Sequence, residues 1–212
     1  MGNEFGHPEW VDFPNVNNDF SYHLCRRRWD LADDGDLRYK FFQNFDELMQ
    51  ALESSFGWLA SSHLHVTVCN DYDKVLAFEK GDCLFVINLH PCNSYNDYKV
   101  GTASAEPMRI VLDTDEERFG GQCRLEGGHA EALQPAGETH NRPSSCLLYL
   151  PARTGQVLVK DSVVKDGIRI WLSTGFLREH SVENPRDLTV SFEIIDEDNV
   201  KRLRHVHFTA DG

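Results

Sequence analysis

The sequence lacks the features that mark membrane and secreted proteins. None of its apolar runs approaches the roughly 20 residues that a membrane-spanning helix needs. It has no Asn-x-Ser/Thr acceptor for N-glycosylation and no basic-then-apolar signal segment at its N-terminus. Its six cysteines form no C-x-x-C pair, which favours free thiols over a disulfide framework. Together these absences predict a soluble, cytoplasmic protein.

Positive charge is scarce as well. The chain has 21 Lys and Arg residues against 34 Asp and Glu residues, which gives a formal net charge of -13. Such a charge repels phosphate backbones and anionic lipid headgroups, so we expect neither nucleic acid nor a membrane surface as a partner. A neutral polymer stays compatible with it. Acidic runs such as residues 113–117 are typical of solvated loops.

Apolar side chains are plentiful by contrast. They make up 41% of the 212 residues and include thirteen Phe, which is enough for a packed core in one large domain or two small ones. The sequence contains neither an internal repeat nor a low-complexity tract, so it indicates neither a solenoid nor a linker. We therefore expect a folded chain.

The first 18 residues are rich in Gly, Pro and Asn and show no regular period. This composition is typical of an irregular loop that is held by tertiary contacts. Exposed apolar rings in such a loop usually mark a missing partner. We expect four rings to be exposed in this way: Phe5, Trp10, Phe13 and Phe20.

Two helices are expected before residue 60. A short one covers residues 25–30, with its arginines outward and Trp29 packed. A longer amphipathic helix follows, which Asp36 or Asp34 can cap and Gly57 can end. Its apolar positions recur at spacings of three and four: Leu37, Phe41, Phe45, Leu48 and Leu52.

Beyond residue 60 the pattern changes to short runs rich in β-branched and aromatic residues, which predict an antiparallel β-domain. The turn at residues 80–82 is typical of a tight hairpin, and residues 118–143 form a long loop. A sandwich is the natural closure of these strands. The predicted strands cover residues 65–69, 75–79, 83–89, 98–102, 108–113 and 146–150, and further strands are expected at 168–172, 188–195 and 200–208.

The order of short motifs in this chain resembles that of one enzyme family. The opening MGNEFGHPEW (1–10) and DFP (12–14) are similar to the segment that eukaryotic-type 1,4-α-glucan (glycogen or starch) branching enzymes, of the α-amylase superfamily, carry just after their last catalytic barrel motif. The same order continues through SYH (21–23), RR (26–27), LRYKF (37–41), NFD (44–46) and GWLA (57–60). It extends through AFE (77–79), FVINLHP (85–91), SY (94–95), DY (97–98), VG (100–101), IVLD (110–113), GG (120–121), NRP (141–143) and LYLP (148–151), and it ends near residue 159.

This resemblance implies a division of the chain into three parts. Residues 1–60 would be the C-terminal remnant of a catalytic (β/α)8 barrel, and residues 61–159 an α-amylase-type all-β C-terminal domain. Residues 160–212 would add β-strands of unknown role. The implied fold class is mainly β. Because Met1 coincides with an internal methionine of the family motif, we expect a fragment, an alternative start or an incorrect gene boundary.

The resemblance also implies the chemistry of a retaining glucanotransferase that forms α-1,6 branches. Such an enzyme needs a nucleophilic carboxylate, a second carboxylate as acid and a stabilising His-Asp pair. We place none of these motifs here, and no His-Asp dipeptide occurs in the chain. We therefore predict no catalytic residue and no turnover by this chain alone.

In the family, the opening loop lies beside the active-site cleft. This implies that the loop contacts or supports an α-glucan, the expected partner in the full enzyme, although loop scaffolding explains the same residues equally well. The candidate substrate-binding residues are Asn3, Glu4, His7, Glu9 and Trp10. Arg26 and Arg27 are better explained by salt bridges than by ligand binding.

Two further patterns favour structural roles. Each His-x-His pair, His63 with His65 and His205 with His207, places two imidazoles on one face of a strand, but no third ligand accompanies either pair. We therefore expect neither a metal nor another cofactor. The aromatic residues Phe85, Tyr95 and Tyr98 are more typical of a sheet core than of a sugar platform.

Three hypotheses stay open from the sequence. The chain is part of a branching enzyme that is active only with the rest of the enzyme, or it is a non-catalytic β-domain that binds glucan or a protein. In the third hypothesis, the tail covers the surface that the barrel normally occupies. That requires four side chains to pack on the long helix: Ile170, Leu172, Phe192 and Ile194.

Overall fold

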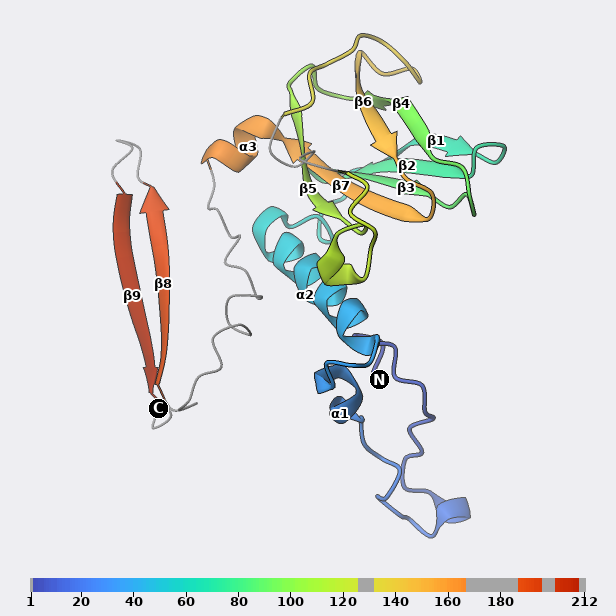
Figure 1. Cartoon of the computed structure of the whole chain (residues 1–212), viewed down its shortest axis with the longest axis vertical. Helices are drawn as coiled ribbons and strands as arrows, with labels where there is room; N and C mark the ends of the chain where they lie inside the picture. Colours follow the sequence, from blue (N-terminus) through green and yellow to red (C-terminus); the bar gives the residue numbers. More distant parts are fainter. Residues whose placement is uncertain (1, 126–131, 167–186, 196–200, 210–212) are drawn as a thin grey trace. The chain divides into compact units, whose positions relative to one another are not determined.

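The computed structural model describes residues 2–125, 132–166, 187–195 and 201–209. The chain divides into two compact units, Met1–Asp161 and Ser162–Gly212. Each is described here by itself (Figure 1). No helix among the described residues is long and apolar enough to cross a membrane.

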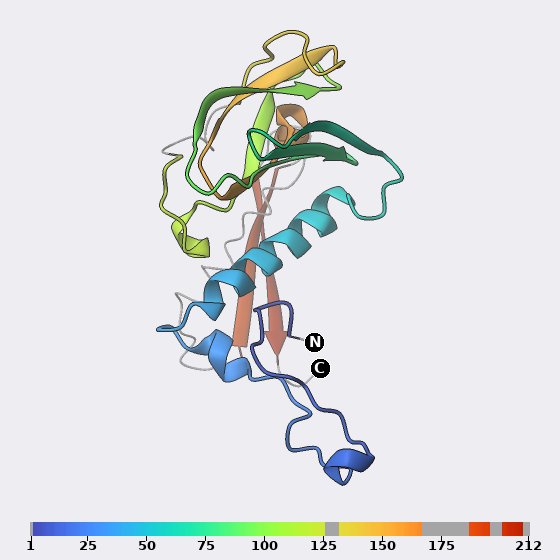
Figure 2. The same ribbon diagram turned by 90° about the vertical axis from the view of Figure 1, so that its right-hand side faces the viewer.

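The first unit begins with an irregular segment that contains three helical elements. They are the 3-10 turn η1 (Val16–Asn18), the short helix α1 (Trp29–Asp33) and the 18-residue helix α2 (Tyr39–Phe56). Figure 2 shows α2 running below the strands of the β-domain. The short helix starts later than predicted, because the backbone at Cys25 is still in a turn in which its N–H donates to the carbonyl of Tyr22.

Helix α2 confirms the amphipathic helix that the sequence predicts. It ends at Gly57, whose φ of 57° is left-handed and whose N–H donates to the carbonyl of Glu53 at 2.7 Å. The predicted capping by Asp34 or Asp36 is wrong. Arg38 occupies the N-cap without a side-chain bond, because the Asp34 carboxylate instead accepts from the backbone N–H of Asp36 at 2.9 Å. The aspartate therefore closes the preceding turn.

Seven antiparallel strands form the β-domain of this unit. The five-stranded sheet has the order β1 (Leu64–Asn70), β2 (Val75–Lys80), β3 (Cys83–Asn88), β7 (Thr154–Lys160) and β5 (Met108–Asp113). The two-stranded sheet pairs β4 (Tyr95–Thr102) with β6 (Ser144–Leu150). The six strands predicted between residues 65 and 150 are all present. The hairpin between β2 and β3 is confirmed too, with Gly81 at a φ of 60°.

Strand β7 was missed in the sequence although it lies between β3 and β5. Five of its seven residues are buried, so it lacks the alternation that marks a strand with one solvated face. It begins directly after Arg153, whose φ of 60° and neighbouring Gly155 are typical of a turn. Without β7 the five-stranded sheet would be split.

One apolar cluster holds the two sheets together. It draws on every strand of the β-domain, for example on Val86 of β3, Val100 of β4, Leu148 of β6 and Leu158 of β7. Side chains from both sheets therefore share one core, which is the arrangement of a sandwich. The predicted mainly β antiparallel fold is confirmed.

The long loop after β5 contains little regular structure in its described residues, 114–125 and 132–143. It carries the turn η2 (Glu117–Phe119) and one bridge that joins Leu133 to Met108. Asp115 organises its first part: its carboxylate accepts from two backbone N–H groups and from the guanidinium of Arg124 at 2.8 Å. The Asp115 carboxylate thus satisfies backbone N–H groups that have no strand partner in this loop, because buried backbone groups need partners.

The second unit contains most of the helix α3 (Asp161–Asp166), which begins at the unit boundary, and a β-hairpin. Strands β8 (Asp187–Ile195) and β9 (Lys201–Thr209) pair in antiparallel register from Asp187 with Thr209 to Ile195 with Lys201. Two of the three predicted C-terminal strands are thus confirmed. The strand predicted at 168–172 lies outside the described residues, as does the predicted packing of the tail through Ile170 and Leu172.

Candidate functional site

The five predicted substrate-binding residues lie in one loop that is anchored by Phe5. This ring was expected to be exposed, but it is 1% exposed, so that expectation is wrong. Its ring centre lies 5.1 Å from that of Trp29 and 5.7 Å from that of His7. The loop closes on α1 around this ring, which leaves Asn3 and Glu9 exposed and Glu4 and His7 partly buried.

Both carboxylates of the loop are paired with arginines. Glu4 lies 2.7 Å from the guanidinium of Arg27, and Glu9 lies 2.8 Å from that of Arg28. Arg28 also pairs with Asp30 at 2.7 Å, and its hydrogen bonds lower the pKa of that carboxyl group. The structural role predicted for Arg27 is confirmed, and the two ion pairs tie the loop to the start of α1.

The imidazole of His7 is held by backbone contacts. Its Nδ1 lies 2.9 Å from the carbonyl oxygen of Glu9, which suits an Nδ1–H donor. Gly2 sits directly beneath it with a φ of 86°, and a Cβ there would come within 2.3 Å of the His7 Cβ. Glycine is therefore required at this turn. His7 supports the loop, whereas Asn3 is exposed.

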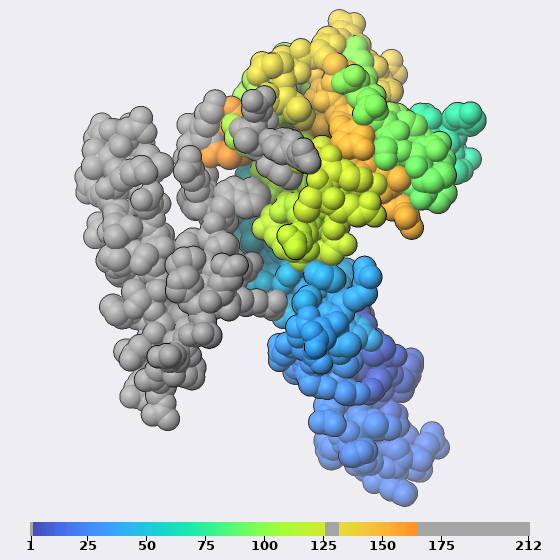
Figure 3. All heavy atoms as spheres, viewed as in Figure 1, coloured from blue at the N-terminus to red at the C-terminus, as the bar shows by residue number. Residues whose placement is uncertain are grey.

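Trp10 begins a segment that we call the aromatic arm, residues 10–24. The ring of Trp10 is 86% exposed, and five more large apolar side chains of the arm are exposed: Phe13, Val16, Phe20, Tyr22 and Leu24. In the space-filling view the N-terminal residues, in blue, form a lobe that stands clear of the β-domain (Figure 3). The exposure expected for Trp10, Phe13 and Phe20 is confirmed.

Polar contacts, rather than burial, shape the arm. The Asn15 side chain caps η1 and also donates to Asp12 at 3.2 Å, and Asn18 donates to the other oxygen of Asp12 at 2.8 Å. The backbone N–H of Asp12 donates to the carbonyl of Leu24 at 3.2 Å and closes the base. The arm thus presents its apolar side chains outward on a polar frame.

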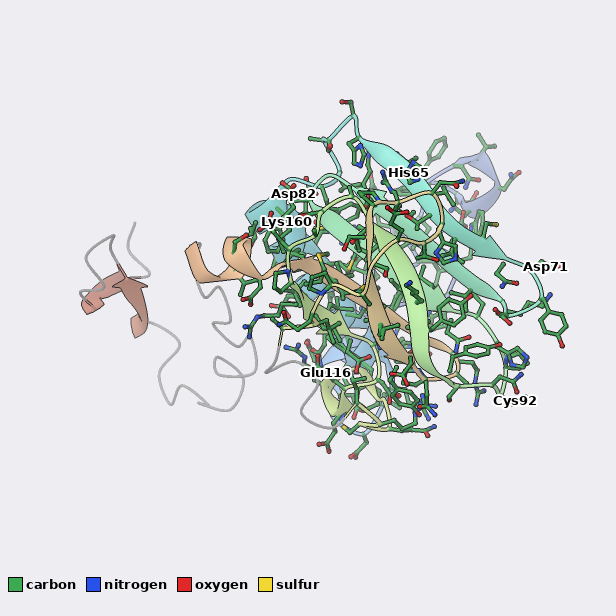
Figure 4. The ribbon with its side chains drawn as sticks, turned by 90° about the horizontal axis from the view of Figure 1, so that it is seen from above. His65, Asp71, Asp82, Cys92, Glu116 and Lys160 are labelled. Atoms are coloured by element: carbon green, nitrogen blue, oxygen red, sulfur yellow. The ribbon has the colours of Figure 1, made fainter. Side chains whose placement is uncertain are left out.

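A cavity of about 400 Å³ with a mixed polar and apolar lining opens at the other end of the first unit, where several strands of the β-domain end. Asp82 and Lys160 lie on this side of the domain, away from Asp71 and Cys92 (Figure 4). Glu79 is buried at its base.

The carboxylate of Glu79 is already fully used. It accepts from the backbone N–H of Ala103 at 2.9 Å, pairs with Arg142 and lies 3.6 Å from His63. We therefore assign this cluster a structural role, because it ties the loops that carry His63, Ala103 and Arg142 to strand β2. The sequence analysis did not predict it, although both partners stand inside the motifs AFE (77–79) and NRP (141–143).

Three aromatic residues of the β-domain, Phe85, Tyr95 and Tyr98, have the structural role that the sequence predicts. Phe85 is buried, and Tyr95 and Tyr98 pack against the shared core. Burial and a hydrogen bond to Asp73 raise the pKa of Tyr98 to about 12. Burial likewise raises the pKa of the Cys83 thiol to about 12, so this buried thiol stays protonated and inert.

Metal ligands do not gather in the part of the chain that the structure describes. No group of three His, Cys, Asp or Glu residues there could hold a metal ion. Of the first His-x-His pair, His63 is directed to Glu79. The side chains of His205 and His207 lie outside the described residues. That the chain binds no metal stays a prediction.

Comparison with known proteins gives the same assignment as the motifs. Residues 65–161 match the family described as the alpha amylase C-terminal all-beta domain. The chain is 48% identical over 159 residues to a 1,4-alpha-glucan-branching enzyme of Felis catus, which covers 74% of this chain and 22% of the relative. It is 43% identical over 157 residues to the enzyme of that name from Rhizophagus irregularis, covering 74% and 23%.

A plant relative extends the range of organisms. The chloroplastic/amyloplastic 1,4-alpha-glucan-branching enzyme of Oryza sativa is 46% identical over 163 residues, covering 73% of this chain and 20% of the relative. The chain therefore spans about a fifth of the length of these relatives. Its resemblance to the C-terminal part of eukaryotic 1,4-α-glucan branching enzymes is confirmed.

Proposed function

We propose that this chain is the C-terminal portion of a 1,4-α-glucan branching enzyme, which transfers glucan segments to form α-1,6 branches in glycogen or starch. The observation that carries the proposal is the identity of 48% over 159 residues, together with the family match over the β-domain at residues 65–161. Residues 1–60 then belong to the catalytic barrel, 61–159 are its C-terminal β-domain, and 160–212 are an addition. We expect a cytoplasmic location.

The chain would contribute support and substrate contact rather than bond breaking. A retaining mechanism needs two carboxyl groups about 5 Å apart across the scissile bond. Glu4 and Glu9 are each held by an arginine, so neither is placed as a free nucleophile or acid. We therefore assign catalysis to the four-fifths of the relatives that this chain does not match.

For glucan contact, Trp10 is the strongest of the five candidates. Its exposed ring offers the flat apolar face on which a sugar ring stacks. Glu9 precedes it in the sequence and is paired with Arg28, and both groups can exchange hydrogen bonds with sugar hydroxyls. Glu4 and His7 would act indirectly by holding the loop in shape.

A chimera tests the proposed function. The full 212-residue chain replaces the matched segment and everything after it in the Felis catus enzyme, and branching is followed by the iodine absorbance of amylose. We expect the chimera to branch and the chain alone to leave the absorbance unchanged. A folded chimera without activity, or new α-1,6 ends made by the isolated chain, would contradict the proposal.

A non-catalytic glucan-binding or protein-interaction domain is the second candidate. It is favoured by the aromatic arm, whose rings are exposed in the isolated chain, and by the β8–β9 hairpin, which lies beyond the family match. Retention of the isolated chain on insoluble glucan, together with an inactive chimera, would select this function.

A further inference from the structure

The outer face of the five-stranded sheet leaves an open apolar cavity beside α2. The cavity has a volume of about 540 Å³ and is lined by side chains of α2, β2, β3 and β7. Figure 2 shows α2 beneath the sheet, with which it shares this space. A void of this size among apolar side chains forfeits the contacts that a close-packed interior would make. Its walls are therefore incompletely packed within the first unit.

Aromatic rings give the cavity a fixed wall. Phe78 and Phe85 stack with their centres 4.9 Å apart, and Trp58 meets Phe85 edge-on at 5.1 Å. The indole Nε1 of Trp58 is buried, yet it finds no hydrogen-bond partner among the described residues. An occupant would supply the apolar contacts that the walls of the cavity lack.

Two of the residues that line the cavity, Leu89 and Arg153, are exposed, which places them at its mouth. Leu89 is 64% exposed although it follows directly on a buried strand. Arg153 is exposed and holds a φ of 60°, a left-handed conformation that is unfavourable for a non-glycine residue. The residues that the structure describes offer its guanidinium no ion-pair partner. A carboxylate brought by the occupant would pair with it.

We propose that this cavity, with Leu89 and Arg153 at its mouth, is a socket for an apolar side chain flanked by a carboxylate. The group comes from the part of the branching enzyme outside the matched segment. This inference rests on the proposed function. Relatives carry about four-fifths of their length outside this segment, so that part would be tethered to the socket at high effective concentration.

Photo-cross-linking in the same chimera tests the socket. Leu89 is replaced by p-benzoylphenylalanine, the sample is irradiated, and the linked peptides are identified by mass spectrometry. We expect links to the Felis catus part of the chimera. The matched control places the same residue at Leu64, which is 60% exposed on strand β1, and should give no such link. Links from Leu89 to residues 162–212, or none, would overturn the proposal.

A charge reversal tests the role of the arginine. Arg153→Glu should lower the cross-linking yield from position 89 about tenfold, because a repulsive pair replaces an attractive one. Lys74→Glu is the control, since Lys74 is also an exposed turn residue with a φ of 58°. An unchanged yield in Arg153→Glu would remove the carboxylate from the proposal.

A chimera that branches without Leu89 links would overturn only the socket, whereas links without branching would count only against the proposed function.

The isolated chain supplies a second readout that does not need the chimera. The dye 1-anilinonaphthalene-8-sulfonate combines an apolar ring with an anion and so imitates the proposed occupant. We expect an increase of its fluorescence that Arg153→Glu reduces and Lys74→Glu does not. Equal fluorescence with both variants would overturn the socket.

Discussion

The β-domain and the aromatic arm use apolar side chains in opposite ways. In the β-domain, residues such as Val86, Val100 and Leu158 are fully buried between two sheets. In the arm, rings such as Trp10 and Tyr22 are exposed while short polar side chains fix the backbone. Burial therefore stabilises the first region, whereas the second keeps its apolar surface for contact outside itself.

The largest effect is expected from Leu158→Ala. Leu158 is 0% exposed and belongs to the core that both sheets share, so its truncation loses transfer free energy and leaves a cavity. The free energy of unfolding should fall by about 3 kcal/mol. Urea unfolding followed by circular dichroism measures it, with the partly exposed Leu147 of β6, changed to Ala, as the control. Equal decreases in the free energy of unfolding at both positions would contradict the expected difference between a buried and an exposed site.

The next effect is expected from Asp115→Asn. Asp115 is buried and accepts bonds from Arg124 and from the N–H of Gln122, so the change weakens a charged pair and a loop. The free energy of unfolding should fall by roughly 2 kcal/mol. Burial raises the pKa of Asp115, but the hydrogen bonds from Arg124 and Gln122 and the charge of Arg124 together outweigh it and hold the pKa below its ordinary value.

The pH dependence follows from this direction. The pKa of Asp115 is lower in the folded chain than in the unfolded chain, where it is about 3.9. The contribution of Asp115 to the free energy of unfolding is therefore complete above about pH 3.9. This contribution is lost as the pH falls from there through the folded pKa. Urea midpoints of the natural chain and of Asp115→Asn should therefore converge at the acid end of that window. Parallel curves would show that the pair does not couple to folding.

A smaller effect is expected from Gly57→Ala at the end of α2. Nothing lies within 4 Å of an added Cβ, so only the φ of 57° opposes the change. The loss should be about 1 kcal/mol in the free energy of unfolding. Gly35→Ala, also in open space but without a left-handed φ, is the control and should be close to neutral.

The smallest effect on stability is expected from Trp10→Ala. Because the ring is exposed, the free energy of unfolding should change by less than about 0.5 kcal/mol. Retention of the chimera on insoluble glucan should nevertheless fall if the ring stacks on sugar. A large loss of stability would place Trp10 with the core and erase the difference between the two regions.

Much of the fold could be predicted from local patterns. The i, i+3, i+4 spacing of apolar residues gives α2, and Gly57 gives its end. The alternation of apolar and polar residues, together with the turn residues between them, predicts the strands that have one solvated face. These patterns do not give β7, because a strand buried on both faces has no alternation. The cap of α2 was missed because Asp34 uses its carboxylate in the preceding turn.

The candidate site could be predicted only in part. The motif of residues 1–10 identified the loop, and the exposure of Trp10 agrees with it. The burial of Phe5 could not be predicted, because it depends on Trp29, which lies far along the chain. The pairing of Glu4 and Glu9 with two arginines also depends on that return of the backbone.

The sequence by itself determined the chemical inventory and the family resemblance, because composition, periodicity and motif order are properties of neighbouring residues. The tertiary structure alone decided which groups are available. It joined Glu79 to Arg142, buried Phe5, left Trp10 exposed and placed Arg153 at the mouth of an apolar cavity. Each outcome depends on contacts between distant segments, whose free energies local patterns do not contain.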